Sequence, residues 1–405
     1  MKRFVSGLLA SAMVISATAA VAQTKPLKLG AILDMSGLYA DITGPGSETA
    51  AKMAAEDFGG EVLGRKIEII AADHLNKADL SANIARDMLD NQGVEAIIDV
   101  AASATALAAS EIARARNKII IFNGPGSIRL SNEACGPYTV HYVFDTFAQA
   151  NVTGLATVKA GLDSWFFLTA DYAFGQDLEK DTTAVVLKSG GKVLGTVKHP
   201  LNTSDFSSFL LQAQSSKAKV VGLANAGGDT INAVKQAAEF GLTKSGGQKL
   251  SPLLAFISDI DSVGLETAQG LILAEAFYWD LNDETRAFSK KFAARMKNGA
   301  PPSMVQAGVY AGLVHYFKAL DALGGNPHDG AKIVAKMKEL PTDDPLFGKG
   351  KIEANGRKIH PGYLFEVKKP SESKAPWDFY KLAGTVPANE AFTPIEKSTC
   401  ALLKK

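Results

Sequence analysis

The sequence VEAIIDVAASATALAASEIARAR spans Val94–Arg116 and contains three patterns in succession. Val94–Val100 is a short apolar run rich in β-branched residues, which predicts a buried parallel strand. Five small residues follow at 101–105. From Thr105 the alanines and the spacing of the larger apolar residues predict a helix that ends near Arg116.

A strand that passes through small side chains into a helix leaves several backbone N–H groups exposed at the start of that helix. These free donors and the positive end of the helix dipole both favour an anion. Ser103 is a candidate N-cap, and Ser103 or Thr105 could add a hydroxyl donor. Two interpretations remain open: a βα turn that is small only for packing, or a pocket for the carboxylate of a small molecule.

The alternation of strands and helices extends on both sides of this stretch. It predicts right-handed βαβ units in parallel sheets and divides into two successive α/β modules. Strands are predicted at 27–33, 66–71, 94–100, 118–122, 140–144, 164–169, 192–197, 218–224 and 252–257, and helices at 44–58, 77–91, 105–116, 146–159, 206–214 and 229–240, with one more ending at 188.

The pattern changes from residue 271 onward, where long amphipathic helices and isolated strands replace the regular alternation. An extended segment is predicted at 271–279, helices at 283–297, 304–323 and 329–340, and strands at 363–367 and 378–382. We expect the chain to return to the first module here. The predicted division is a first lobe of 23–144 plus 280–345, a second lobe of 145–279 plus 346–390, and a C-terminal tail of 391–405.

Composition excludes several classes of protein. The 405 residues are 46% hydrophobic and 21% charged, which is ordinary for a globular protein with sizeable cores. The formal charge is +1, from 43 basic and 42 acidic residues, and no segment concentrates the positive charge. Nucleic-acid binding therefore has no electrostatic support. No stretch after the first residues is long and apolar enough to predict insertion into a membrane.

The N-terminus has the pattern of an export signal. Lys2 and Arg3 precede a mostly apolar segment, and Ala20-Val21-Ala22 fits a signal-peptidase site. We expect residues 1–22 to be a signal peptide cleaved after Ala22, and the mature protein to be periplasmic and monomeric.

The chain has two cysteines, Cys135 and Cys400. In an exported protein they predict one disulfide that ties the C-terminus to the first third of the chain. The alternative is two free thiols. A metal site is not predicted, because two thiols without a nearby histidine pair lack the usual ligand set.

Motifs for catalysis and cofactors are mostly absent, so we expect no cofactor and no catalytic residue. G-x-S-x-G, H-E-x-x-H and paired C-x-x-C do not occur, and the glycine pairs at 44–46 and 124–126 lack the third glycine of a dinucleotide site. Candidate residues instead follow the predicted strands, where ligands bind in open α/β sheets. The candidate ligand-binding residues are Tyr39, Ala102, Ser103, Thr105, Gly124, Gly126, Tyr172, Phe174, Asn225, Gly227 and Asp259.

At these loops the chain resembles the substrate-binding proteins of ABC importers in the leucine/isoleucine/valine-binding family, over residues 27–382. The shared features are Met35-Ser36-Gly37, Gly60-x-x-Leu63-Gly64-Arg65-Lys66-Ile67, Asp171-Tyr172-Ala173-Phe174-Gly175, Asp205-Phe206-Ser207 and the helix end Lys235-Gln236-Ala237 to Gly241. The resemblance implies a type I periplasmic binding fold, in which two doubly wound parallel-sheet lobes joined by a three-strand hinge enclose a ligand without transforming it.

The resemblance also implies roles for individual residues. Ala102, Ser103 and Thr105 fall on the segment that holds the ligand carboxylate, Phe174 on an aromatic contact, and Asp259 on the acid that meets an α-ammonium group. Pro125 falls where the amino-acid binders use a small residue, and Gly126 where they use a threonine. Ala102 and Gly126 thus lack hydroxyls that amino-acid binders usually carry, and Ala226-Gly227 replaces tyrosines.

These observations predict a solute receptor that takes a small carboxylate and delivers it to ABC permease subunits in the inner membrane. The first expectation for the ligand is a branched-chain or other hydrophobic amino acid, and the alternative is an aromatic or other non-amino organic acid. A hydrolase or lyase using Asp259 or Asp261 with His141 is a rival from another class. A tethered ligand-sensing domain is a third option, which the cleavable leader argues against.

Overall fold

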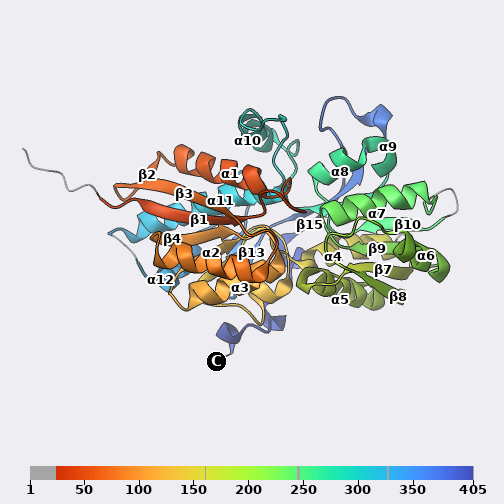
Figure 1. Cartoon of the computed structure of the whole chain (residues 1–405), viewed down its shortest axis with the longest axis horizontal. Helices are drawn as coiled ribbons and strands as arrows, with labels where there is room; N and C mark the ends of the chain where they lie inside the picture. Colours follow the sequence, from red (N-terminus) through yellow and green to blue (C-terminus); the bar gives the residue numbers. More distant parts are fainter. Residues whose placement is uncertain (1–23, 160, 244–246, 326–327, 405) are drawn as a thin grey trace, which may run out of the picture.

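The computed structural model describes residues 24–159, 161–243, 247–325 and 328–404. Within them the chain forms two α/β lobes that lie side by side, each built on its own sheet (Figure 1). The predicted signal peptide lies outside the described residues.

The first lobe contains a six-stranded sheet in the order β2-β3-β1-β4-β5-β6. All neighbouring strands are parallel except the short β2, which forms a hairpin with β3. The strands are β1 (Leu27–Leu33), β2 (Glu61–Val62), β3 (Arg65–Asp73), β4 (Val94–Asp99), β5 (Ile119–Phe122) and β6 (Thr139–His141).

Helices cover both faces of this sheet because its central strands carry apolar side chains on both sides. Leu29 and Ala31 of β1 pack into the core that includes α1 and α11. Ile32, the next residue after Ala31, points to the opposite face and packs with α2 and α3. The helices are α1 (Gly44–Asp57), α2 (Ala78–Asp90), α3 (Ser103–Arg114), α11 (Met304–Leu323) and α12 (Gly330–Glu339).

The second lobe contains a four-stranded parallel sheet in the order β10-β9-β7-β8. Its strands are β7 (Ser164–Ala170), β8 (Lys192–His199), β9 (Val220–Ala224) and β10 (Lys249–Pro252). Its helices are α4 (Thr146–Lys159), α5 (Ala173–Lys188), α6 (Ser207–Ser216), α7 (Gly228–Glu239), α8 (Ile257–Val263) and α9 (Leu265–Ala268). The prediction of an α/β fold with two parallel-sheet lobes is therefore confirmed.

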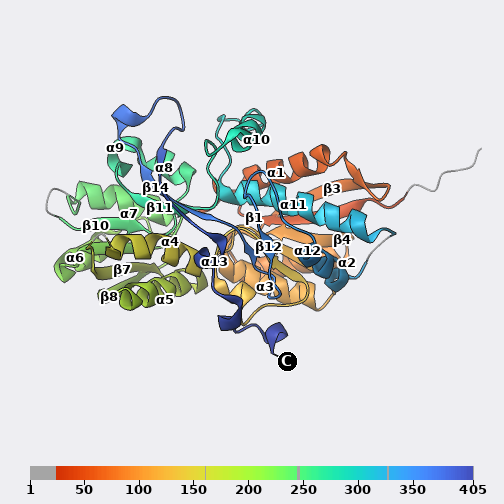
Figure 2. The ribbon, with the colours of Figure 1, turned by 180° about the vertical axis from the view of Figure 1, so that it is seen from behind.

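The chain crosses between the lobes in three places, seen together from behind in Figure 2. The crossings lie between β6 and α4, between β11 (Ile272–Glu275) and α10 (Asp283–Ala293), and between β13 (Lys358–Ile359) and β14 (Gly362–Val367). Beside the second lobe, β11, β14 and β15 (Tyr380–Val386) form a three-stranded antiparallel sheet.

One segment lies in a different lobe from the one predicted. Residues 346–390 were assigned to the second lobe, but the hairpin of β12 (Lys351–Ile352) and β13 packs on the first. There β12 contacts α12, and Arg357 pairs with His141 of β6. The glycine- and lysine-rich turns around this hairpin carry no periodic pattern that would indicate which sheet they join.

Two predicted elements differ in their bounds. The strand predicted at 252–257 is instead β10 at Lys249–Pro252, and the apolar residues after Pro252 form a loop that leads into α8. The central helix begins at Ser103, two residues before the predicted start, because the small side chains at 103–105 are already helical.

The predicted disulfide is present between Cys135 and Cys400, whose Cα atoms are 5.7 Å apart. It fixes the C-terminal tail, which includes α13 (Ala388–Ala391), to the first lobe. Among the described residues, no helix has the length and apolar character needed to cross a bilayer.

Candidate functional site

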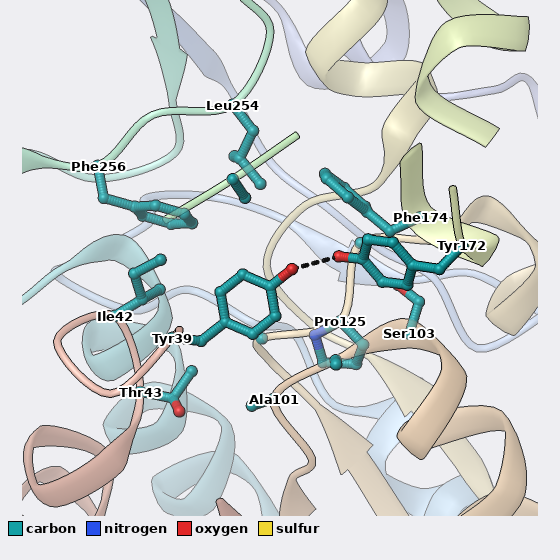
Figure 3. Close-up of a pocket in the computed structure, with 14 residues that line it drawn as sticks. Tyr39, Ile42, Thr43, Ala101, Ser103, Pro125, Tyr172, Phe174, Leu254 and Phe256 are labelled. Atoms are coloured by element: carbon teal, nitrogen blue, oxygen red, sulfur yellow. Dashed lines mark hydrogen bonds between the residues drawn. The ribbon is translucent and has the colours of Figure 1, made fainter. Parts of the chain in front are cut away.

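A small cavity lies between the lobes, at the carboxyl ends of strands from both sheets (Figure 3). The first lobe contributes loops after β1, β4 and β5, and the second lobe contributes loops after β7, β9 and β10. The lining residues are Tyr39, Ile42, Thr43, Ala101, Ala102, Ser103, Gly124, Pro125, Gly126, Tyr172, Phe174, Ala226, Leu254 and Phe256.

The N-terminus of α3 forms one wall of this cavity. Ala102 is the N-cap residue and has no side-chain cap, so the first N–H groups of the helix are left without an intrahelical acceptor. The prediction that Ser103 caps the helix was wrong. Ser103 is the first helical residue, and its hydroxyl oxygen accepts a hydrogen bond from the backbone N–H of Ser127 at 3.1 Å. The hydroxyl hydrogen of Ser103 remains available to a ligand.

The turn before α3 is held in an uncommon backbone conformation. Asp99 and Val100 have φ angles of 70° and 57°, which L-residues seldom adopt and which are least favourable for a β-branched residue. The buried Asp99 carboxylate accepts hydrogen bonds from Ser47 Oγ at 2.6 Å and from the N–H of Gly124 at 2.7 Å. Burial raises the pKa of Asp99 to about 7, although these two bonds lower it.

Two glycines bring the β5 loop close to its neighbours. A Cβ atom at Gly124 would lie 2.9 Å from Asp99 Oδ1. At Gly126 it would lie 2.5 Å from the ring of Phe144 and 2.9 Å from the ring of Phe174. Any larger side chain at Gly126 would therefore enter the space between the lobes.

The loop after β1 is organised by Asp34, a buried residue that the sequence alone did not single out. Its carboxylate accepts hydrogen bonds from the N–H of Gly37 at 2.7 Å and of Tyr39 at 2.9 Å, and it also contacts Asn76. These bonds place the Tyr39 ring against the cavity.

The two lobes touch across the cavity, so the structure is in a closed arrangement. The hydroxyl oxygens of Tyr39 and Tyr172 are 2.6 Å apart and meet in the middle of the lining residues (Figure 3). At the rim, the N–H of Gly228 donates to the carbonyl of Leu38 at 3.4 Å. Burial raises the pKa of both tyrosines, so both phenols are neutral and can donate hydrogen bonds.

The wall from the second lobe is mostly apolar. Phe174 lies at the start of α5, and Leu254 and Phe256 lie in the loop that the sequence had placed in a strand. The Phe256 ring also packs edge-on against Phe144, with ring centroids 6.2 Å apart.

Seven of the eleven predicted site residues line the cavity: Tyr39, Ala102, Ser103, Gly124, Gly126, Tyr172 and Phe174. The other four lie outside its lining. Thr105 is buried and donates to the carbonyl of Ala102 at 2.7 Å. Asn225 accepts from Thr230 at 2.7 Å and contacts His199, and Gly227 lies against the backbone of Leu38.

Asp259, the predicted partner of an ammonium group, is also outside the lining and has a structural role. It is buried at the start of α8, where its carboxylate accepts a hydrogen bond from the N–H of Phe256 at 3.0 Å. Burial, with a smaller contribution from Asp41, raises the pKa of Asp259 to about 7.

Several lining residues were missed by the sequence analysis. Ile42 and Thr43 lie between the loop after β1 and the start of α1, and no sequence pattern marks them as site residues. Leu254 and Phe256 gave a signal that was misread, because an apolar run after a strand is equally typical of a strand and of a pocket wall.

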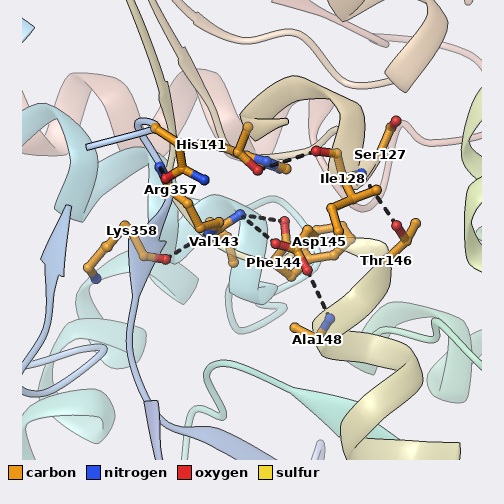
Figure 4. Close-up of polar contacts among 12 residues, drawn as sticks. Ser127, Ile128, His141, Val143, Phe144, Asp145, Thr146, Ala148, Arg357 and Lys358 are labelled. Atoms are coloured by element: carbon orange, nitrogen blue, oxygen red, sulfur yellow. Dashed lines mark hydrogen bonds and ion pairs between the residues drawn. The ribbon is translucent and has the colours of Figure 1, made fainter. Parts of the chain in front are cut away.

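The first crossing between the lobes is linked to the cavity by a buried polar network (Figure 4). Arg357 donates to the carbonyl of Phe144 at 2.9 Å and lies 3.8 Å from the Asp145 carboxylate. One residue further, the N–H of Thr146 donates to the carbonyl of Gly126 at 2.8 Å. Because Gly126 lines the cavity, this hydrogen bond joins the first crossing to the binding loop.

The residues proposed for a rival enzyme are not assembled. His141 is buried, and its Nε2 lies 2.8 Å from the carbonyl oxygen of Pro125. Within the described ranges no hydrogen bond or ion pair joins it to Asp259 or Asp261. Nor do the described residues contain a group of three or more His, Cys, Asp or Glu side chains that could hold a metal ion.

Comparison with known proteins gives a consistent result. The sequence profile of a periplasmic binding protein family matches residues 26–374. The chain is 27% identical to the Leu/Ile/Val-binding protein homolog 6 of Brucella melitensis over 367 residues, which cover 89% of this chain and 92% of the relative.

Three solved structures are similar over nearly their whole length. A periplasmic binding protein from Burkholderia mallei has 52% identity and a TM-score of 0.90, covering 94% of this chain and 99% of that one. A branched-chain amino acid ABC transporter periplasmic ligand-binding protein from Burkholderia xenovorans has 35% identity and a TM-score of 0.83, covering 93% and 99%. A solute-binding protein from Rhodopseudomonas palustris in complex with 3,4-dihydroxybenzoic acid has 25% identity and a TM-score of 0.80, covering 90% and 98%.

Proposed function

The chain belongs to the periplasmic binding protein family, in the branch of leucine/isoleucine/valine-binding relatives, and from that premise we propose that its ligand is a monocyclic aromatic carboxylate. Proteins of this kind are substrate-binding components of ABC transporters and not enzymes. We propose that it works in the periplasm, where it closes on this ligand and presents it to a permease in the inner membrane.

The carboxylate has a binding site at the start of α3. The unpaired N–H groups there and the dipole of the helix favour an anion. The Ser103 hydroxyl lines the same part of the cavity and has a hydrogen to donate. Thr43 Oγ1 is buried on the lining and, within the described residues, has no partner, so it can bind a second polar group of the ligand.

The rest of the cavity suits a flat apolar body. Phe174, Phe256 and Leu254 provide rings and an aliphatic face from the second lobe. The Tyr39 and Tyr172 hydroxyls can exchange their mutual hydrogen bond for bonds to a ring hydroxyl. The lining residues leave only a small space between the closed lobes, which favours a small ligand.

The observation that carries the proposal is the charge of the lining. Among the described residues that form it, none is acidic, while one wall is the positive end of a helix. An α-ammonium group buried there would lack a carboxylate partner, which is unfavourable in a closed cavity. The complex of the Rhodopseudomonas palustris relative supports the same class of ligand.

A hydrophobic amino acid is the second candidate, because relatives named for leucine, isoleucine and valine share the fold. It would require Asp259 to leave the N-terminus of α8 and face the cavity.

Thermal unfolding with each compound separates the two candidates. A ligand at about 100 times its dissociation constant adds roughly 2.7 kcal/mol to the free energy of unfolding. We expect benzoate, 4-hydroxybenzoate or 3,4-dihydroxybenzoate to raise the melting temperature, and Asp259→Asn to keep that response. If leucine raises it and the aromatic acids do not, the proposal is wrong, and loss of the leucine response in Asp259→Asn would assign the ammonium site.

A further inference from the structure

A second hollow lies outside the cleft, where α10 meets the arm of residues 368–379 that joins β14 to β15. It is open to solvent, has a volume of about 360 Å³, and shares no lining residue with the cavity between the lobes. We call it the tryptophan groove and define it by Trp279, Trp377, Pro301, Pro376, Ser289 and Lys290.

The walls of the tryptophan groove come from both halves of the molecule. On one side, α10 and the residues after it are tied to α1 of the first lobe by the ion pairs Arg295–Glu56 at 2.7 Å and Lys291–Asp57 at 3.8 Å. On the other side, Trp377 belongs to the arm of the antiparallel sheet beside the second lobe. The shape of the groove therefore depends on how the lobes are placed.

Trp377 is fixed in a strained conformation. Its φ angle is 66°, in the left-handed region that bulky residues rarely adopt. Its carbonyl oxygen accepts hydrogen bonds from Trp279 Nε1 at 2.8 Å and from the Tyr278 hydroxyl at 3.3 Å. Such strain persists only where neighbours hold it, and it is found most often at ligand sites and switches. Here the hydrogen bonds of its carbonyl hold Trp377 in the groove that Trp279 also lines.

The polar groups of the groove favour an anion. Ser289 is only 3% exposed, and within the described residues its hydroxyl oxygen has no hydrogen-bond partner, which is uncommon for a buried polar atom. Arg286 is paired with the carboxylates of Asp280 at 2.8 Å and Asp283 at 2.6 Å, neither of which lines the groove. Lys290 is exposed and has no ion-pair partner in the described part of the chain, and no described lining residue is acidic, so Lys290 is the cation that a ligand in the groove can meet.

We propose that the tryptophan groove is a second binding site, which takes a planar aromatic anion. The ring lies against the two indoles and the prolines, and the anionic group faces Lys290. Since the walls come from both halves of the molecule, an occupant that contacts both favours the closed arrangement over the open one. This site does not depend on the ligand class proposed for the cleft.

The test uses 1-naphthoate as the probe and isothermal titration calorimetry as the measurement. Gly126→Val fills the cleft, so saturable binding to this variant reports on the groove alone. In that background, Lys290→Glu should weaken binding about fivefold, because an exposed ion pair contributes up to ~1 kcal/mol. The matched control is Lys332→Glu, an exposed lysine of α12, which should leave the affinity unchanged. The neutral amide of the probe should bind more weakly than the acid.

Ala293→Trp gives an independent check, because Ala293 lines the groove and a large side chain there blocks it without removing any of the proposed contacts. Trp377→Ala should abolish binding if the variant unfolds at a temperature near that of its parent. The proposal is overturned if Gly126→Val shows no saturable binding of 1-naphthoate, or if the affinity is the same in Lys290→Glu and Ala293→Trp as in their parent.

Discussion

Asp99 and Gly126 shape the backbone of the site and supply no polar side-chain group to the ligand. Asp99 holds a turn whose positive φ angles would otherwise be unfavourable by about 1–3 kcal/mol for each residue. Gly126 allows the β5 loop to approach two aromatic rings. Both residues place backbone groups around the start of α3, and both can be tested by one substitution.

Gly126→Val should abolish binding of the aromatic acid in the cleft while leaving the fold intact. The new side chain begins 2.5 Å from Phe144 and 2.9 Å from Phe174, so it must occupy the cavity or push the rings into it. Calorimetric titration measures the loss. Gly384→Ala is the control, because its new Cβ atom meets only Leu364, at 3.9 Å. Unchanged affinity in Gly126→Val would show that the ligand binds elsewhere.

The contribution of Asp99 to the free energy of unfolding should fall as the pH rises from about 4 to 7. The folded pKa of Asp99 is about 7 and its ordinary value is 3.8, so the folded state keeps a proton that the unfolded state releases in this range. Stability present below pH 3.8 is then lost toward pH 7, by at most about 1.4 kcal/mol per pH unit for one carboxyl group.

Urea unfolding at several pH values measures this slope. Asp181 and Asp259 contribute in the same direction, since burial raises the pKa of each to about 7. The buried His141 and His360 contribute in the opposite direction, since burial lowers the pKa of each. Asp99→Asn should therefore remove the Asp99 share of the slope and leave the rest of the profile in place. A profile parallel to that of the unaltered protein would contradict the account of Asp99.

At the scale of elements, helices and strands with a periodic pattern of apolar residues were predicted from the sequence, and loops without such a pattern were not. The helices α4 and α11 have the predicted bounds of 146–159 and 304–323, because long apolar stripes fix a helix. The loop after Pro252 was misread, since Leu254 and Phe256 are apolar for the sake of the cavity and not of a sheet. The role of Asp259 is a local one, because its carboxylate accepts the N–H of Phe256 at the start of α8, and the sequence did not place that helix.

The disulfide is an element whose removal should lower stability without affecting the ligand. Cys135 and Cys400 are separated by 265 residues, and closing so long a loop stabilises the fold by roughly 5.6 kcal/mol in the chain-entropy model, less any strain. The double variant Cys135→Ser/Cys400→Ser should unfold at lower urea concentration and bind the aromatic acid with unchanged affinity. Equal urea midpoints would show that the bond contributes nothing measurable.

Arg357 should be essential to the first crossing. Arg357→Ala leaves the buried Asp145 carboxylate without its cation, and such a change destabilises a fold by about 3–5 kcal/mol. Urea unfolding measures the loss. The control is Arg129→Ala, whose exposed pair with Glu133 should contribute no more than ~1 kcal/mol. Similar losses in both variants would contradict a special role for the buried pair.

At the scale of the whole molecule, the proposed function requires two lobes that close around a ligand. The Tyr39–Tyr172 contact and the Leu38–Gly228 hydrogen bond exist only while the lobes are together. A ligand that binds both walls shifts the population toward this closed arrangement. The three crossings allow that movement, and the Arg357 network links one of them to the binding loop.

The most direct test of the central claim is a crystal structure of the protein with 4-hydroxybenzoate. The account predicts an unaltered ligand between the lobes, with a carboxylate oxygen about 3 Å from a backbone nitrogen at the start of α3 and the ring between Phe174 and Phe256. A carboxylate bound away from Ser103, or an ammonium-bearing ligand facing Asp259 in its place, would contradict it.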